Sequence, residues 1–126
     1  MIRGLEAVLV GSADAGKLAE FYRDVVGLKM GMVMDIGDKG ERGYEFPLKG
    51  AGLYLLDHSK VKGKTKDPSR VMFNLEVDDI EKEVARLKKK KVKPVTDIYH
   101  VEGYGLIATF ADPDGNYFQF VQTRAS

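Results

Sequence analysis

The side chains that could carry acid–base or metal chemistry are few in this sequence. Its 126 residues include two histidines, His58 and His100, and no cysteine. The lack of cysteine excludes disulfides, thiolate metal sites and a cysteine nucleophile. His100 lies in the segment HVEGYG (100–105), which we expect to be a flexible loop, and a single loop histidine is more often exposed than catalytic. Imidazole chemistry is therefore limited from the outset.

The overall composition excludes several classes of function. Hydrophobic residues make up 44% and charged residues 31% of the sequence, which is ordinary for a soluble domain. The net charge of +1 gives no general attraction to nucleic acid or to an anionic membrane. No apolar run approaches the roughly 20 residues of a membrane span, and the start, MIRGLEAVLVG, lacks the apolar run of a signal peptide. We therefore expect a cytoplasmic protein.

The first half of the sequence predicts a strand, a helix and three further strands. The strand covers residues 5–10, and Asp14 is placed to cap the following helix through the free amides of its first turn. Helical spacing relates the apolar residues Leu18, Phe21, Tyr22, Val25 and Val26. Gly27 should end this helix in a left-handed conformation. Three strands joined by hairpins are expected within residues 28–37, 42–50 and 52–58.

After a polar, basic linker at residues 59–70 the same order of elements begins again. Residues 71–77 predict a strand, and Asp78 and Glu81 have the spacing of a capping box at the start of a helix. Four lysines at 88–91 suit the negative end of that helix. No aromatic residues lie between these lysines, so we do not interpret them as a nucleic-acid site. Residues 92–100, 104–111 and 116–123 predict three more strands.

Two halves of similar length thus share one plan, strand–helix–strand–strand–strand. We expect an α+β fold in a single domain, 1–126, made of two βαβββ modules at about 1–58 and 71–126. Neither half could easily bury its sheet alone, so the halves should pack together.

Three stretches of sequence resemble the vicinal oxygen chelate superfamily, which includes glyoxalase I, bleomycin-resistance proteins and extradiol dioxygenases. They are Asp14 followed by EFYRDVVGLKM (20–30), LEVDDIEKEV (75–84) and YGLIATFADPDGNYFQFVQ (104–122). The resemblance covers nearly the whole chain. It implies two βαβββ modules whose curled mixed sheet surrounds a cleft, with the helices on the outer face.

The segment DPDG (112–115) has a structural role that does not depend on this resemblance. Pro113 suits the second position of a type I turn, Asp112 can bond back onto the turn, and Gly115 accepts a positive φ. The turn therefore sets the register of the last strand and decides which face Gln119 occupies.

Strand alternation predicts which side chains line the cleft. Phe118 and Phe120 share one face of the last strand and should pack under a helix, as should Phe73, Leu75 and Val77. The cleft face should then carry Tyr117, Gln119 and Val121 from the last strand, Met72, Asn74 and Glu76 from the strand after the linker, and Ala7, Leu9, Tyr54, Leu56 and His58 from the first half.

Metal-dependent members of the superfamily hold His or Glu at one position on each of four strands. Counting from Asp14, Asp79 and the DPDG turn, the resemblance places three of these positions at Ala7, Met72 and Gln119. Analogy between GLYLL and GNYFQ places the fourth at Leu56. Divalent metals need carboxylate or imidazole ligands, and this set offers neither. The resemblance therefore implies a site without a metal.

A displaced site is the alternative. Glu6 is adjacent to Ala7, and His58 and Glu76 could reach the cleft as part of a metal site or as an acid–base pair. The simpler interpretation places both near strand ends, partly solvated, and we prefer it.

The remaining cleft residues favour binding without chemistry. The ligand-binding candidates are Ala7, Leu9, Tyr54, Leu56, Met72, Asn74, Tyr104, Tyr117 and Gln119. This mixture of apolar, aromatic and amide side chains suits a hydrophobic or aromatic small molecule. We expect a cofactor-free homodimer, similar to bleomycin-resistance proteins, that sequesters such a ligand. The alternatives are a glyoxalase-like lyase, isomerase or dioxygenase with a displaced metal site or metal-free acid–base catalysis, and a partner module whose cleft is filled by its own side chains.

Overall fold

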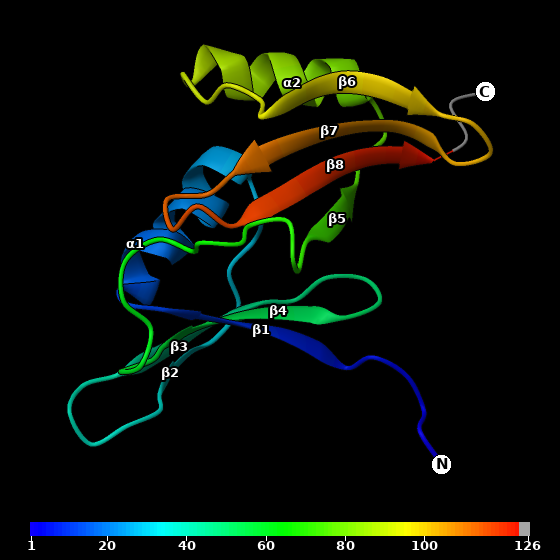
Figure 1. Ribbon diagram of the computed structural model, residues 1–126. Helices are drawn as coiled ribbons and strands as arrows, with labels where there is room; N and C mark the ends of the chain where they lie inside the picture. Colours follow the sequence, from blue (N-terminus) through cyan, green and yellow to red (C-terminus); the bar gives the residue numbers. More distant parts are fainter. Residues whose placement is uncertain (124–126) are drawn as a thin grey trace. The chain divides into compact units, whose positions relative to one another are not determined.

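The computed structural model describes residues 1–123. The chain divides into two compact units, with the boundary between Gly63 and Lys64. This boundary lies inside the predicted linker, and each unit contains one βαβββ module (Figure 1). The predicted α+β class is thus confirmed, and each module builds its own mixed four-stranded sheet. The single-domain assignment stays a prediction.

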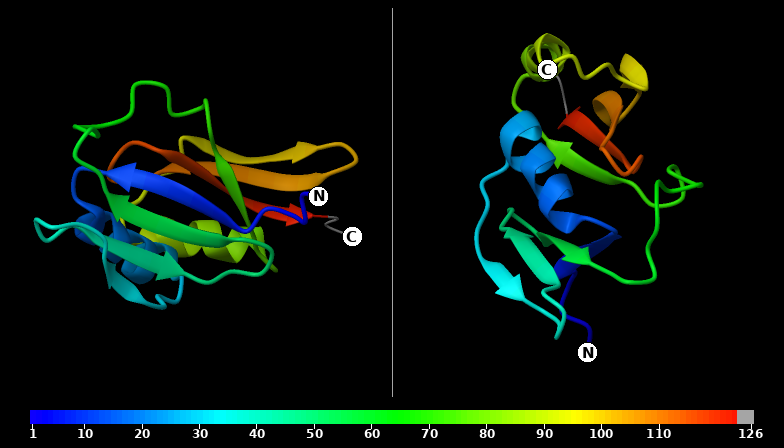
Figure 2. Two further views of the ribbon diagram at one scale, coloured as in Figure 1. Left: turned by 90° about the horizontal axis from the view of Figure 1, so that it is seen from below. Right: turned by 90° about the vertical axis from the view of Figure 1, so that its left-hand side faces the viewer.

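Unit 1 contains a sheet in the order β1-β4-β3-β2. Its elements are β1 (Ala7–Ser12), α1 (Ala15–Glu20), η1 (Phe21–Val26), β2 (Val33–Asp35), β3 (Arg42–Phe46) and β4 (Gly52–Asp57). The left view of Figure 2 shows β1, β4 and β3 side by side, with β1 parallel to β4 and β4 antiparallel to β3. The parallel pair is possible because the intervening helix and two strands return the chain to the sheet's middle.

Unit 2 repeats this arrangement in the order β5-β8-β7-β6. Its elements are β5 (Phe73–Glu76), α2 (Ile80–Lys89), β6 (Thr96–Val101), β7 (Gly105–Ala111) and β8 (Tyr117–Thr123). β5 is parallel to β8, and β8–β7 and β7–β6 are antiparallel. The DPDG turn leads into β8 as predicted: the Asp112 carboxylate accepts the backbone amides of Asp114 and Asn116, and Gly115 has φ +80°.

Each sheet has one face covered by the helix of its own unit, here called the helix face, and an opposite face that this helix does not cover, here called the open face. In unit 2, Ile107, Thr109 and Val121 on the open face are nevertheless buried. On the helix face of unit 2, Phe110 and Phe118 stack with ring centroids 5.8 Å apart, and Ile80 and Leu87 of α2 are fully buried. Leu18 of α1 and Leu55 of β4 are buried in the same way in unit 1. Burying an aliphatic or aromatic side chain contributes about 1.5–3 kcal/mol each, so these faces hold each module together.

The face assignments from alternation agree with the register. Gln119 pairs with Asn74, and Phe118 pairs with Phe73, so the phenylalanines and amides lie on opposite faces. In unit 1, Leu9 pairs with Tyr54 on the open face, while Leu55 is buried on the helix face.

One predicted helix detail was wrong, and the other helix contains a segment that was not predicted. The cap of α2 is Asp79, whose side chain accepts the amide of Lys82. The predicted Asp78–Glu81 capping box therefore begins one residue too early. The helix after Asp14 is not α-helical throughout, because residues Phe21–Val26 form a π-helical segment. The amides of Gly27 and Leu28 both donate to the carbonyl of Tyr22, at 3.0 and 2.9 Å. Gly27 ends it with φ 95°, as predicted.

Within residues 1–123, none of the helices has the length and apolar character needed to cross a membrane.

Candidate functional site

The last strand of each module holds the start of that module's helix in the same way. The amide of Ala15 donates to Oδ1 of Asp57 at 2.8 Å, and the amide of Ile80 donates to Oε1 of Gln122 at 2.8 Å. Gln122 follows Asp57 by 65 positions, which is also the spacing between the helix caps Asp14 and Asp79. This spacing aligns the two modules residue by residue.

The alignment corrects one positional equivalence. Leu9 pairs with Tyr54 in unit 1, and Asn74 pairs with Gln119 in unit 2, again 65 positions apart. The counterpart of Gln119 is therefore Tyr54, not Leu56. The analogy between GLYLL and GNYFQ aligned Tyr54 with Tyr117. The strand pairing instead aligns Tyr54 with Gln119, two residues further along β8.

A row of uncharged polar side chains crosses the open face of unit 2. Asn74, Gln119, Thr109 and Thr96 stand opposite one another on the four strands in turn. Nε2 of Gln119 donates to Oγ1 of Thr109 at 2.8 Å, and Nδ2 of Asn74 donates to Oη of Tyr104 at 3.1 Å. Both amide nitrogens are thus engaged, which leaves the amide oxygens of Asn74 and Gln119 as acceptors for a ligand.

Tyr104 links the turn between β6 and β7 to β5. Its hydroxyl meets Asn74 although β8 and β7 lie between β5 and β6 in the sheet. The side chain is 38% exposed, so its ring is available to a ligand at the edge of the open face. Of the other predicted residues in this unit, Met72 is 40% exposed and Tyr117 is half-buried.

The open face of unit 1 carries a carboxylate, Glu45, that the sequence reasoning missed. Oη of Tyr54 donates to Oε2 of Glu45 at 3.2 Å, and the amide of Met32 donates to Oε1 of Glu45 at 3.0 Å. The hydrogen bond to Glu45, followed by burial, raises the pKa of Tyr54. Leu9 on the same face is 63% exposed, and Ala7 and Leu56 are half-buried. Alternation in RGYEF, where Tyr44 and Phe46 face the helix, could have placed Glu45 on the open face.

No lysine or arginine of the eight described strands lies on either open face. Arg42 is the only lysine or arginine within the eight described strands. It pairs with Asp35 and lies two residues before Tyr44 in β3, so its side chain lies on the helix face with that of Tyr44. The carboxylates on the open faces are Glu45 and Glu76, and Glu76 accepts a hydrogen bond from Thr123 at 3.0 Å. The strands therefore contribute acidic but no basic side chains to these faces.

The alternative metal residues are not gathered within unit 1. Glu6 precedes β1 and His58 follows β4, and because these strands run parallel the two residues lie at opposite ends of the pair, about 20 Å apart. Nδ1 of His58 accepts the amide of Lys60 at 3.2 Å, so one ring nitrogen already closes a turn.

The positions that hold a metal in related enzymes do not fit one here. Ala7, Tyr54, Met72 and Gln119 supply no carboxylate and no imidazole. Throughout the described part of the chain, no group of three His, Asp or Glu side chains is arranged to bind a metal ion. The register confirms that Gln119 lies on the face opposite Phe118, as alternation predicts, and its assignment to a metal-ligand position stays a prediction.

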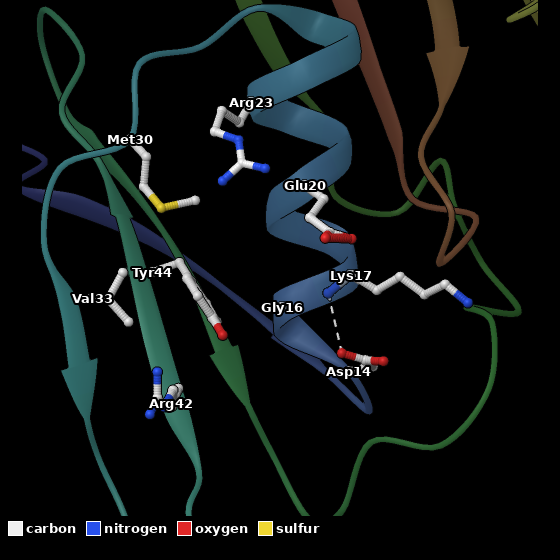
Figure 3. A pocket seen from close by; sticks show the side chains of 9 residues that line it. All are labelled: Asp14, Gly16, Lys17, Glu20, Arg23, Met30, Val33, Arg42 and Tyr44. Atoms are coloured by element: carbon white, nitrogen blue, oxygen red, sulfur yellow. Dashed lines mark hydrogen bonds between the residues drawn. The ribbon is translucent and has the colours of Figure 1, made fainter.

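A separate groove lies on the helix face of unit 1, between α1–η1 and the strands β2 and β3 (Figure 3). Its volume is about 570 Å³. The residues that line it are Asp14, Gly16, Lys17, Glu20, Arg23, Met30, Val33, Arg42 and Tyr44. None of these was predicted as a site residue, because sequence periodicity assigns them to a helix surface and a sheet edge.

Comparisons with known proteins agree with this fold and with its repeat. Residues 4–120 match the family model of the Glyoxalase/Bleomycin resistance protein/Dioxygenase superfamily. The chain belongs to this superfamily, which confirms the predicted family.

One curated relative and two solved structures illustrate the range of similar proteins. The chain is 29% identical over 116 residues to mitochondrial methylmalonyl-CoA epimerase of Mus musculus, covering 86% of this chain but only 65% of that protein's length. The structure of TnmS3, an antibiotic binding protein from Streptomyces sp. CB03234, is 25% identical, with a TM-score of 0.75 and 97% of each chain covered. The fosfomycin resistance protein FosX from Listeria monocytogenes shares the fold at 19% identity, with a TM-score of 0.72 and 99% and 97% of the two chains covered.

Proposed function

We propose that this protein binds and sequesters a hydrophobic or aromatic small molecule without a metal. The observation that carries this proposal is the pair of neutral amides, Asn74 and Gln119, on the neighbouring strands β5 and β8 of the open face of unit 2. Each amide nitrogen is held by a neighbouring hydroxyl, at 3.1 and 2.8 Å, and the oxygens remain free to accept from a ligand. Binding sites of this kind combine apolar walls with a few polar anchors.

Charge narrows the class of ligand. On the open face of unit 2 the described strands present Glu76 but no lysine or arginine. Exposed Met72 and the ring of Tyr104 supply apolar and aromatic surface in the same unit. A neutral or cationic aromatic compound with a hydrogen-bond donor suits these surfaces. An acyl-CoA or a phosphonate would meet negative charge without a compensating cation. The likeness to an antibiotic binding protein supports the same class.

The second candidate function is an enzyme of the isomerase type. It is favoured by the similarity to methylmalonyl-CoA epimerase and by Glu76 on the open face of unit 2, a carboxylate that could act as a general base. The lack of lysine and arginine on the described strands' open faces argues against an anionic thioester substrate, so we place this candidate second.

Native mass spectrometry tests the proposal. The protein is purified without added metal or chelator and incubated with 2-naphthamide, a neutral aromatic amide. We expect one organic molecule per chain, no divalent ion, and the mass of a homodimer. Gln119→Met, which keeps the side-chain length and removes the amide, should lose the adduct. His100→Gln is the matched control, because His100 is exposed and pairs with Leu106 on the other face of the same sheet.

The outcomes separate the two candidates. Loss of the adduct in Gln119→Met alone supports binding at the amide row. A stoichiometric divalent ion overturns metal independence and favours the enzyme. Equal adduct occupancy in both variants places the ligand elsewhere and contradicts the proposed site.

A further inference from the structure

The groove on the helix face of unit 1 has an apolar wall formed by the strand side. Met30, Val33 and the ring of Tyr44 line it, and Val33 is 46% exposed. Figure 3 shows these side chains facing the helix across an open space. Such a wall can bury the body of an aromatic or aliphatic ligand, at about 25 cal/mol per Å² of apolar surface.

Two polar groups on the same wall, the Tyr44 hydroxyl and the Arg42 guanidinium, have few hydrogen-bond partners among the described residues. The Tyr44 hydroxyl lies close to the helix, since a Cβ added at Gly16 would come within 3.0 Å of it. Among residues 1–123 it makes no hydrogen bond with another side chain or with the backbone. The guanidinium of Arg42 has its nearest carboxylate, Asp35, at 3.7 Å, and both side chains are more than half exposed. A planar oxyanion could take hydrogen bonds from Arg42 in a two-point geometry.

Arg23 contributes positive charge to the groove from the helix side. Its guanidinium is bound by both carboxylate oxygens of Asp24, at 2.7 and 2.9 Å, and this ion pair raises the pKa of Arg23. Arg23 belongs to the π-helical segment, and such segments occur frequently at functional sites. In Figure 3 its side chain extends from the helix toward the strands, whereas Lys17 extends away from them.

The charged residues in and beside the groove limit the charge of a ligand that can bind there. Among the lining residues Lys17, Arg23 and Arg42 are positive, and Asp14 and Glu20 are negative. Asp24 pairs with Arg23 at 2.7 Å, whereas Asp35 lies 3.7 Å from Arg42, so Arg42 has the weaker ion pair of the two arginines. The carboxylate of Asp14 is engaged by the amide of Lys17 at 3.1 Å. One weakly paired guanidinium can hold one carboxylate group, whereas a phosphate dianion would need more positive charge than the groove offers.

We propose that this groove binds an organic monocarboxylate with an aromatic or aliphatic body. The carboxylate lies between Arg42 and the Tyr44 hydroxyl, and the body lies against Met30 and Val33. This site differs from the proposed amide-row site in the face of the sheet, in the unit of the chain and in the charge of its ligand, so each can fail without the other.

The test uses 2-naphthoate, with the isosteric 2-naphthamide as the neutral comparison. Binding is followed by isothermal titration calorimetry and by amide chemical shifts in ¹⁵N-labelled protein. We expect 2-naphthoate to shift the amides of Gly16, Val33 and Tyr44. Arg42→Gln should weaken its binding about 10-fold or more, because a hydrogen bond to a charged group is lost.

Two further variants complete the test. Tyr44→Phe keeps the ring and should weaken 2-naphthoate binding about 3- to 10-fold, as expected for one lost hydrogen bond. Arg3→Gln is the matched control, since Arg3 is exposed and precedes β1, away from the lining residues. Unchanged affinity in both Arg42→Gln and Tyr44→Phe, or amide shifts confined to residues outside the groove, would overturn the proposal.

Discussion

Gln119 and Tyr54 occupy the same position in the two modules, and each holds a partner on the neighbouring strand. Gln119 donates to Thr109 at 2.8 Å, and Tyr54 donates to Glu45 at 3.2 Å. Both pairs stand directly opposite across an antiparallel ladder on the open face. One position of the repeat thus provides a neutral contact in unit 2 and an acidic contact in unit 1. The two faces are therefore chemically different, although their backbones match.

The first prediction concerns the Gln119–Thr109 contact. Thr109→Val should lower the free energy of unfolding by about 1 kcal/mol, because it removes one hydrogen bond at nearly constant volume. Thr109 is 5% exposed, so its hydroxyl has little water to replace this partner. Urea denaturation measures the change.

Thr96→Val is the control for this measurement. Thr96 lies on the same row but is exposed, so its substitution should change the free energy of unfolding by less than about 0.5 kcal/mol. Equal effects of the two substitutions would mean that the Gln119–Thr109 bond is not a stabilising contact in solution.

The second prediction is a pH dependence in unit 1. The hydrogen bond to Glu45 raises the pKa of Tyr54 above the ordinary value of 10.0 for tyrosine. Because the folded-state pKa is raised, the stabilisation is fully present below about pH 10 and is lost as pH rises through the raised pKa. Titration of ¹³Cζ-labelled tyrosine by NMR should show a late-titrating ring that is absent in Tyr54→Phe.

Glu45→Gln distinguishes the cause of this shift. It keeps a hydrogen-bond acceptor for Tyr54 but removes the negative charge, so the pKa of Tyr54 should move back toward 10.0. A Tyr54 pKa unchanged by this substitution would assign the shift to burial instead.

Much of the architecture was predictable from local signals in the sequence. Asp14, Gly27 and the DPDG turn mark element ends through side-chain and backbone chemistry that acts within a few residues. Alternation then placed Phe118 and Gln119 on opposite faces, as the register confirms. These signals are short-range, and a single sequence contains them in full.

The misplaced details depend on contacts between distant residues. Besides the Asp79 cap, the start of α2 is held by Gln122, which accepts the amide of Ile80 and lies 42 positions further along the chain. The equivalence of Tyr54 and Gln119 appears only once the parallel pairs are known. Similarly, the groove lined by Arg42 and Arg23 joins a strand to a helix, and no periodicity links those two residues.

The third prediction tests how the modules hold their helices. The Asp57 carboxylate accepts two amides, Ala15 at 2.8 Å and Arg42 at 2.9 Å, and thereby ties the helix to β3. Asp57→Ala should cost about 2–3 kcal/mol of unfolding free energy, since bonds to a charged acceptor are lost. Asp57→Asn keeps one carbonyl oxygen and should cost less. Thermal and urea unfolding give the order, and a smaller loss for Ala than for Asn would contradict the double-acceptor role.

The fourth prediction asks whether a metal site can be restored in unit 2. Met72 immediately precedes β5 and shares the open face with Asn74, so its side chain lies diagonally across from Gln119 on the neighbouring strand. Diagonal neighbours of this kind lie roughly 7–8 Å apart at their backbones, within reach of one shared ion. Met72→His together with Gln119→Glu therefore supplies an imidazole and a carboxylate, and calorimetry should detect Ni²⁺ binding that is stronger than in either single variant. If the folded double variant binds Ni²⁺ no better than Met72→His alone, Gln119 and residue 72 do not face the same space, and Gln119 does not stand at a former ligand position.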